Sequence, residues 1–139
     1  MSCMLRASGA NFDVDLFLKD CGLEPVRVWH KGERKAPNSE TYLRISAASS
    51  VSFEVSDADF SELNLQFADA QIWLTMNRDE VIRLVQFPGV EGVSVDFGAE
   101  IRPPGWSSFS VPPALTSLVG ALGVDLEISV YPISDEAVS

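Results

Sequence analysis

The chain has 139 residues, the length of a single domain, and a chain of this size buries roughly two thirds of its unfolded surface when it folds. Apolar residues make up 46% and charged residues 22%, which excludes an intrinsically disordered protein. No apolar run approaches the ~20 residues of a membrane span, and the formal net charge of −10 argues against nucleic acid as a partner, because phosphate binding requires a basic surface.

The start of the sequence has no basic stretch followed by an apolar segment. We therefore expect no export signal, a cytoplasmic location and no contact with a membrane. Cys3 and Cys21 are too few for a disulfide framework, so we expect both to be small apolar groups in a reducing compartment.

The first elements are predicted to be a strand, a helix and a second strand. Residues 4–8 are strand-like, and the next helix can begin at Asn11 or Asp13 as N-cap and end at Gly22. An alternating pattern then predicts a strand over residues 26–31.

The middle of the chain begins with charged and turn-forming residues at 32–40, which predict an exposed loop. Residues 42–45 and 51–55 are strand-like, either as one interrupted strand or as a hairpin around residues 47–50.

A long helical region is expected to open at Asp57 or Asp59. Its apolar face has helical spacing and consists of Leu63, Phe67, Ala70 and Leu74. Asn77 with Glu80 resembles a capping box, so this region is either one helix kinked near Asn77 or two helices in tandem.

In the last third of the chain, the sequence predicts a strand over 93–97, a loop over 102–106, a helix from Pro112-Pro113 to Gly123, a strand over 124–131 and a frayed tail over 134–139.

The predicted elements of the whole chain have the order β-α-β-β-α-β-α-β. We expect one α+β domain over residues 1–133. It would be a ferredoxin-like β-α-β-β-α-β unit with an appended α-β unit, its helices packed on one face of a mainly antiparallel sheet.

Several segments resemble an uncharacterised bacterial family named domain of unknown function 4279. The opening stretch carries the pattern through Gly22, Leu23, Pro25, Trp29, Lys31 and Gly32. The segments Phe87–Gly98 and Leu122–Pro132 are similar to the family in the same order. The resemblance covers nearly the whole chain. It implies one domain of bacterial type, and it implies no activity and no catalytic residues.

Positive charge is concentrated near the start of the chain. Residues 1–50 carry seven basic and six acidic side chains, whereas residues 51–139 carry three and fourteen. The candidate binding residues of this region are Arg27, Trp29, His30, Lys31, Gly32, Arg34 and Lys35, and Trp106 is a second aromatic candidate. They predict a surface site for an anion or an acidic group. The alternative is a strand end whose tryptophan packs on the core, followed by a solvated loop.

Catalytic and metal chemistry have little support in the sequence. His30 is the only histidine, and neither cysteine has a metal-ligand spacing. Cys21 lies on the apolar face of the predicted first helix, where an inert thiol is expected. We therefore expect no metal, no cofactor and no catalytic residue.

Two functional hypotheses of different class remain. The first is a non-catalytic binding or protein-interaction module that forms a homodimer or binds a basic protein. The homodimer is expected because the second face of an open sheet needs cover. The alternative is a small-ligand-binding domain or small enzyme with its site around residues 29–35. A concave pocket that combines Trp29, His30 and acidic groups would favour it.

Overall fold

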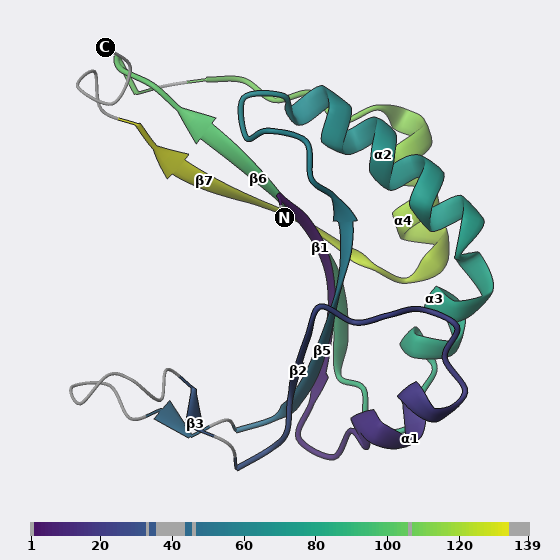
Figure 1. Ribbon diagram of the computed structural model, residues 1–139. Helices are drawn as coiled ribbons and strands as arrows, with labels where there is room; N and C mark the ends of the chain where they lie inside the picture. Colours follow the sequence, from purple (N-terminus) through teal and green to yellow (C-terminus); the bar gives the residue numbers. More distant parts are fainter. Residues whose placement is uncertain (1, 33, 36–43, 46, 106, 134–139) are drawn as a thin grey trace.

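The computed structural model describes residues 2–32, 34–35, 44–45, 47–105 and 107–133. Its helices are α1 (Val14–Lys19), α2 (Leu63–Met76), α3 (Arg78–Val85) and α4 (Pro113–Leu122). Its strands are β1 (Cys3–Gly9), β2 (Arg27–Trp29), β3 (Arg34–Lys35), β4 (Arg44–Ile45), β5 (Ser49–Ser56), β6 (Gly92–Ile101) and β7 (Asp125–Pro132). The four helices lie on the same side of the large sheet (Figure 1).

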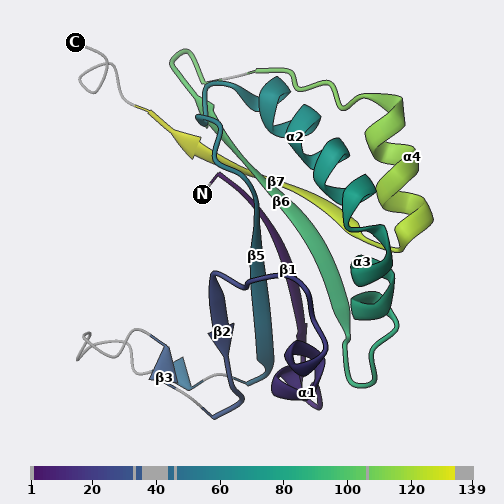
Figure 2. The ribbon, with the colours of Figure 1, turned by 45° about the vertical axis from the view of Figure 1, so that its right-hand side comes forward.

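The large sheet is mixed, with the strand order β2-β5-β1-β6-β7. The first three neighbouring pairs are antiparallel, and β7 runs parallel to β6. Figure 2 shows the helices along one face, while no described helix covers the other face, which we call the open face. The α+β class and the placement of the helices on one face are therefore confirmed.

The hydrophobic core fills the space between the sheet and the helices. Alternation along the strands directs Leu5, Phe53 and Phe97 toward the helices, where each is at most 2% exposed. Phe67 of α2 meets Phe97 edge-on, with ring centroids 4.8 Å apart. The apolar face predicted for α2 is confirmed, since all four of its residues are buried.

Helix α1 begins as predicted and ends earlier. Asp13 is the N-cap, and its Oδ1 accepts a hydrogen bond of 3.1 Å from the N–H of Leu16. The helix ends at Lys19, before the predicted Gly22, because the chain turns and the thiol of Cys21 accepts from the N–H of Leu23 at 3.4 Å.

Helix α2 begins at Leu63, so a start at Asp57 or Asp59 was the wrong prediction. The preceding residues run beside β6 beyond the end of β1, where the carbonyl of Phe60 accepts from the N–H of Glu100 at 3.3 Å. The Phe60 ring lies over Gly98, where any Cβ would be 2.8 Å from a ring carbon. The segment therefore forms a turn, closed by a hydrogen bond of 2.9 Å from the N–H of Glu62 to the carbonyl of Asp59, and it is held against β6 instead of forming a first turn of α2.

The boundary between α2 and α3 is at Asn77, which confirms two helices in tandem. The predicted capping box is absent from it. The side-chain amide of Asn77 donates to the carbonyl of Trp73 at 2.9 Å, so it ends α2 and makes no side-chain cap for α3.

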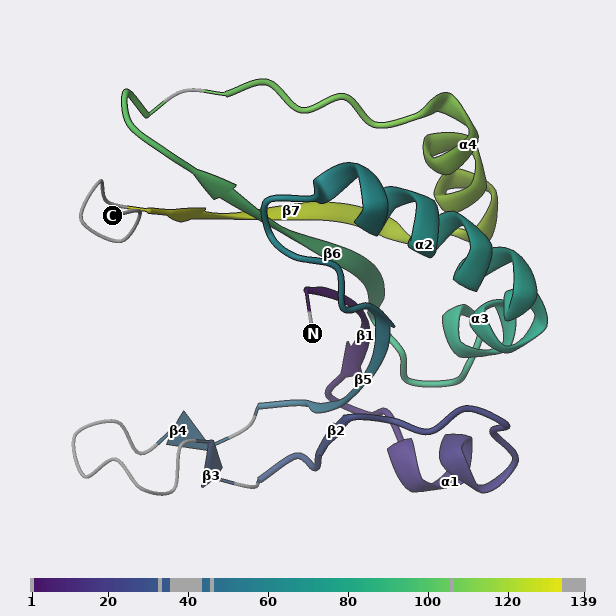
Figure 3. The same ribbon diagram turned by 45° about the horizontal axis from the view of Figure 1, so that its top comes forward.

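Residues 32–45 contain more structure than an exposed loop. β3 and β4 pair antiparallel in a separate two-stranded sheet, with Arg34 opposite Ile45 and Lys35 opposite Arg44. β4 and β5 therefore belong to different sheets, and neither the interrupted strand nor the hairpin around residues 47–50 is formed. The small ribbon lies apart from the helix layer (Figure 3).

The strand predicted over residues 26–31 is shorter than expected, since β2 consists of Arg27–Trp29. The elements of the last third follow the sequence closely. β6 and β7 include the predicted strands at 93–97 and 124–131, apart from residue 124, and α4 ends at Gly123, whose φ of 77° favours glycine. The predicted tail at 134–139 and most of the 32–40 loop lie outside the described residues. The assignment of residues 1–133 to one domain stays a prediction.

Candidate functional site

The predicted binding segment begins in the edge strand β2. The register pairs Arg27 and Trp29 with serines of β5, and it pairs Val28 with a buried valine. Because directly paired residues point to the same face, Arg27 and Trp29 lie on the open face and Val28 faces the core. Trp29 is half-buried, and it is not among the described side chains that pack against the core.

His30 lies on the other side of the sheet edge. Its Nε2 is 3.0 and 3.1 Å from the two carboxylate oxygens of Asp15, in the first turn of α1. Since α1 covers the helix side, the fold separates His30 from Trp29. The two residues therefore have different surroundings, His30 beside α1 and Trp29 on the open face.

The rest of the predicted segment leads into the small ribbon. Lys31 is exposed, and its backbone N–H donates to Ser49 Oγ at 2.9 Å. Gly32 has a φ of 93°, and Arg34 and Lys35 form β3, where the backbone alone is described. Trp106 lies outside the described residues. Arg27 and Trp29 are thus the predicted residues that the structure places on one face.

One row of side chains crosses the open face through every strand of the large sheet. The register aligns, in order, Arg27 of β2, Ser52 of β5, Arg6 of β1, Ser94 of β6 and Asp125 of β7. The row runs from a cation at one edge to a carboxylate at the other, with Arg6 between two serines in the middle.

A cavity of about 290 Å³ lies along this row. Its polar lining consists of Arg6, Ser8, Ser50, Ser52, Ser94, Asp125 and Glu127. Each serine hydroxyl both donates and accepts hydrogen bonds, and its short side chain leaves room above the strand. The open face therefore offers hydrogen-bonding groups along this row. It also carries aromatic side chains, Trp29 at the β2 edge and Tyr131 toward the end of β7, where Tyr131 stacks on Phe60.

The centre of the open face holds a neutralised ion pair. Nη1 of Arg6 lies 2.9 Å from Oδ2 of Asp96, and the hydroxyl of Ser129 donates to Oδ1 of Asp96 at 2.7 Å. The Asp96 side chain is 8% exposed and that of Arg6 is 51% exposed. Both carboxylate oxygens are thus satisfied, and this pair leaves no excess charge at the centre of the face.

The acidic edge of the face is β7. Asp125 and Glu127 are exposed and alternate with Leu126 and Ile128, which are part-buried against the core. β7 comes last in the strand order and has eight residues, whereas β2 at the opposite edge has three. The long edge of the sheet thus carries carboxylates beside backbone groups that no described strand pairs.

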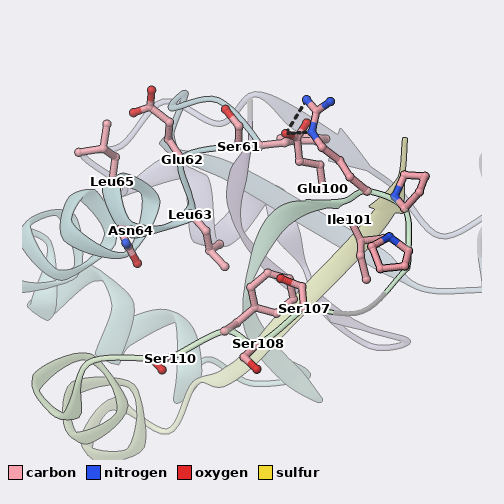
Figure 4. A pocket seen from close by; sticks show the side chains of 15 residues that line it. Ser61, Glu62, Leu63, Asn64, Leu65, Glu100, Ile101, Ser107, Ser108 and Ser110 are labelled. Atoms are coloured by element: carbon pink, nitrogen blue, oxygen red, sulfur yellow. Dashed lines mark hydrogen bonds and ion pairs between the residues drawn. The ribbon is translucent and has the colours of Figure 1, made fainter. Parts of the chain in front are cut away.

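A larger cavity, of about 660 Å³, lies at the other end of β6, near the start of α2 (Figure 4). Its polar lining consists of Ser61, Glu62, Asn64, Glu100, Arg102, Ser107, Ser108 and Ser110. Phe60, Leu63, Ile101 and Phe109 add apolar surface. Trp29 pairs near the opposite end of the sheet, so this cavity and the predicted segment are separate sites.

The walls of this cavity are held by hydrogen bonds. Arg102 donates to Glu100 Oε1 at 3.0 and 3.2 Å. The pKa of Asp59 lies below its usual value because Oδ1 accepts from the N–H and the hydroxyl of Ser61, both at 2.9 Å. Behind them, the buried amide of Gln66 donates to the carbonyl of Gly98 at 2.7 Å and accepts from its N–H at 3.2 Å.

The two thiols have raised pKa values. Burial raises the pKa of Cys3 far above its usual range, and the carboxylates of Asp96 and Asp69 raise it further. Burial is also the main cause that raises the pKa of Cys21, and Glu80 adds to it. Both thiols are therefore held in the protonated form, which is a poor nucleophile.

The described residues also bear on metal binding and on membrane-spanning helices. They bring together no group of three or more histidine, cysteine or acidic side chains that could hold a metal ion. None of their helices combines the length and apolarity that crossing a bilayer would take.

No family model, no curated protein and no solved structure matches this chain. The resemblance to domain of unknown function 4279 stays a prediction.

The sequence alone did not predict the two cavities or the acidic edge of the sheet. The larger cavity joins residues 60–65 to residues 100–110, which only the pairing of distant segments brings together. The acidic edge left a local signal, since Asp125, Glu127 and Ser129 alternate with apolar residues. Recognising that edge also required the strand order, because alternation does not say which strand is outermost.

Proposed function

We propose that this protein is a non-catalytic binding module that holds a basic, extended segment of a partner protein along β7. The observation that carries this function is the coincidence of the longest uncovered sheet edge with two exposed carboxylates, Asp125 and Glu127.

The backbone of β7 supports this mode of binding. An edge strand presents unpaired N–H and C=O groups, and an added strand gains main-chain hydrogen bonds from them. Eight residues offer a longer ladder than the three residues of β2. The segment would extend the sheet beyond β7 and lie beside the open face.

The charge distribution supports a basic partner. Arg6 and Asp96 neutralise each other. The open face also carries Arg27 at the β2 edge, Glu54 on β5, and the carboxylates of Asp125 and Glu127 at the β7 edge. The last 89 residues also carry a net charge of −11. Such a field speeds the approach of a cationic segment and disfavours an acidic one.

The test is comparative capture of partners from a lysate of the cell that encodes the protein. The immobilised parent chain is compared with the double variant Asp125→Asn/Glu127→Gln, which removes two charges from β7 and keeps the side-chain shapes. We expect the basic proteins captured by the parent to fall at least about tenfold with this variant, at low salt.

A matched control removes two exposed charges elsewhere, through Asp20→Asn/Glu24→Gln. This control should capture the same proteins as the parent. If the β7 variant and the control capture equally well, or if both lose the same proteins, binding depends on net charge or on another surface and not on β7.

A small-ligand function has one observation in its favour. The cavity near the start of α2 has about 660 Å³, within the roughly 300–1,000 Å³ of small-molecule sites. A thermal-shift screen of polar metabolites tests it: a hit should raise the melting temperature of the parent and leave that of Arg102→Gln unchanged. Equal shifts in both proteins would place the ligand elsewhere.

We further propose that β2, β5, β1 and β6 form a ferredoxin-like unit, to which α4 and β7 are appended. The order of these strands and their antiparallel pairing support it. The cytoplasmic location also stays a prediction.

A further inference from the structure

The outer face of α2 is apolar and uncovered in the described structure. Leu65 is 51% exposed, Ile72 60% and Met76 78%. Together with the exposed Ala68 they follow helical spacing and form one stripe, about 17 Å long. We call these four residues the α2 stripe. The opposite side of the same helix carries Phe67 and Leu74 into the core.

The α2 stripe contains no charged residue. Asp69 is the one charged residue of α2; it is part-buried beside the stripe and accepts a hydrogen bond of 2.6 Å from the hydroxyl of Ser56. The chain as a whole has a net charge of −10 and 22% charged residues. Helix α4 also has no charged residue, but its exposed side chains are small, such as those of Ala114 and Ser117. The α2 stripe differs because it exposes three large apolar side chains, and apolar surface of this kind marks an interaction site.

The stripe has the shape of a helix-packing surface. A hollow on α2 is lined by Ala68, Gln71, Ile72, Thr75 and Met76. Four of them, at positions i, i+3, i+4 and i+7, form the kind of hole that receives a side chain from a facing helix. Ala68 is small enough to leave the hole open, and the protruding side chains of the same stripe are apolar knobs of suitable size. Hole and knobs thus belong to one surface, which makes it self-complementary.

We infer that two copies of this chain form a symmetric dimer by packing their α2 stripes against each other. A second copy fits better than a partner of opposite charge, because the stripe has no charge to complement. One helix face per copy gives an interface at the small end of the range, below about 1,200 Å² in total, so the dimer is weak and reversible. This contact goes beyond the proposed function, since α2 and β7 lie on different parts of the molecule (Figure 2).

Salt provides a distinctive signature of this dimer. Two copies with −10 charges repel each other, and the α2 stripe supplies no ion pair to offset the repulsion. Raising NaCl from 20 to 500 mM shortens the Debye length from about 20 Å to about 4 Å. The dimer should therefore become stronger with salt, whereas a contact held by cationic and anionic side chains would become weaker.

The experiment is sedimentation velocity of the full chain from about 5 to 500 µM at both salt concentrations. We expect the parent to show a monomer–dimer equilibrium that shifts toward dimer at 500 mM NaCl. Ile72→Glu, and independently Met76→Glu, should weaken association at least tenfold, because each places a charge within the packed stripe. Circular dichroism and thermal melting establish that the variants are folded, as expected for exposed positions.

The matched control is Leu16→Glu, which adds the same charge at an apolar residue of α1 that is 54% exposed. It should dimerise as the parent does. A parent that is monomeric at 500 µM in both salts would overturn the inference, and so would a dimer that dissociates at high salt. Equal weakening by Leu16→Glu and Ile72→Glu would also overturn it. None of these outcomes bears on capture by β7, which the variants leave intact.

Discussion

Within the described part of the chain, no helix covers the open face of the sheet and no element covers the outer face of α2, and the two surfaces differ in their chemistry. The open face has serines, an internal ion pair and carboxylates at one edge, whereas the α2 stripe has exposed apolar side chains and no charge. One surface can bind through directional hydrogen bonds and charge, and the other through apolar packing. These two surfaces of one fold therefore need not bind the same partner.

If the open face is a binding surface, its side chains should contribute little to the free energy of unfolding. The side chains on the core side of the same strand, β6, should contribute much more. Phe97 is fully buried in the middle of β6. Phe97→Ala should lower the free energy of unfolding by about 3–5 kcal/mol, because it leaves a cavity. Ser94→Ala, on the open face, should change it by less than about 0.5 kcal/mol in the same urea titrations. A large loss in Ser94→Ala would show that the open face is structural.

The two sides of α2 should differ in a similar way. Gln66 bonds both backbone groups of Gly98 from the buried side, so Gln66→Ala should cost about 2 kcal/mol by leaving buried groups unsatisfied. Gln71→Ala, beside the α2 stripe, should cost less than about 0.5 kcal/mol. Chemical denaturation of the two variants makes the comparison, and similar losses would contradict the assigned division between an inner and an outer face.

Arg6 tests whether the centre of the open face is neutralised. Arg6→Gln removes the cation from the nearly buried carboxylate of Asp96, which keeps its hydrogen bond from the Ser129 hydroxyl. The expected loss is about 1 kcal/mol because Arg6 is half exposed. Arg27→Gln removes the same charge at the sheet edge and should have no measurable effect on unfolding. If both variants lose the same free energy of unfolding, the loss reflects the change in net charge and not the ion pair between Arg6 and Asp96.

The smallest expected effect concerns pH and the core side of β1. The pKa of Cys3 is raised in the folded state above its ordinary 9.0, so the unfolded chain loses the thiol proton first. The resulting stability is fully present below that pH and declines as the pH rises above it. The melting temperature of each protein is measured from neutral pH to about pH 11. Between about pH 9 and 11 it should fall less in Cys3→Ala than in the parent, each relative to its own value at neutral pH. If the melting temperatures of both proteins fall equally, groups other than Cys3 cause the loss of stability at alkaline pH.

Local patterns predicted the parts of the fold that depend on nearby residues. Alternation located β1, β6 and β7, and the spacing of Leu63, Phe67, Ala70 and Leu74 identified the buried side of α2. The start of α2 was not predictable in this way. Asp59 looks like a helix cap, but Phe60 is held against Gly98 of a strand that comes much later in the chain.

The site was less predictable than the fold for the same reason. The strand predicted over residues 26–31 is formed in part, and its register places Trp29 on the face opposite Val28. The sequence did not show that His30 meets Asp15 while Trp29 lies on the open face, because adjacent residues at a strand end can turn to opposite sides. The acidic edge depends on strand order, which is a property of the whole sheet.

The most direct test of the central claim is an NMR titration with a ten-residue peptide of alternating lysine and valine, which is basic and favours an extended conformation. In 20 mM NaCl the account predicts amide shifts concentrated along β7, including Asp125 and Glu127, with no shifts along α2. Binding should weaken at least about tenfold in 500 mM NaCl and in Asp125→Asn/Glu127→Gln. Shifts scattered over the acidic residues of the whole surface, or affinity unchanged in the double variant, would contradict the assignment of β7 as the binding edge.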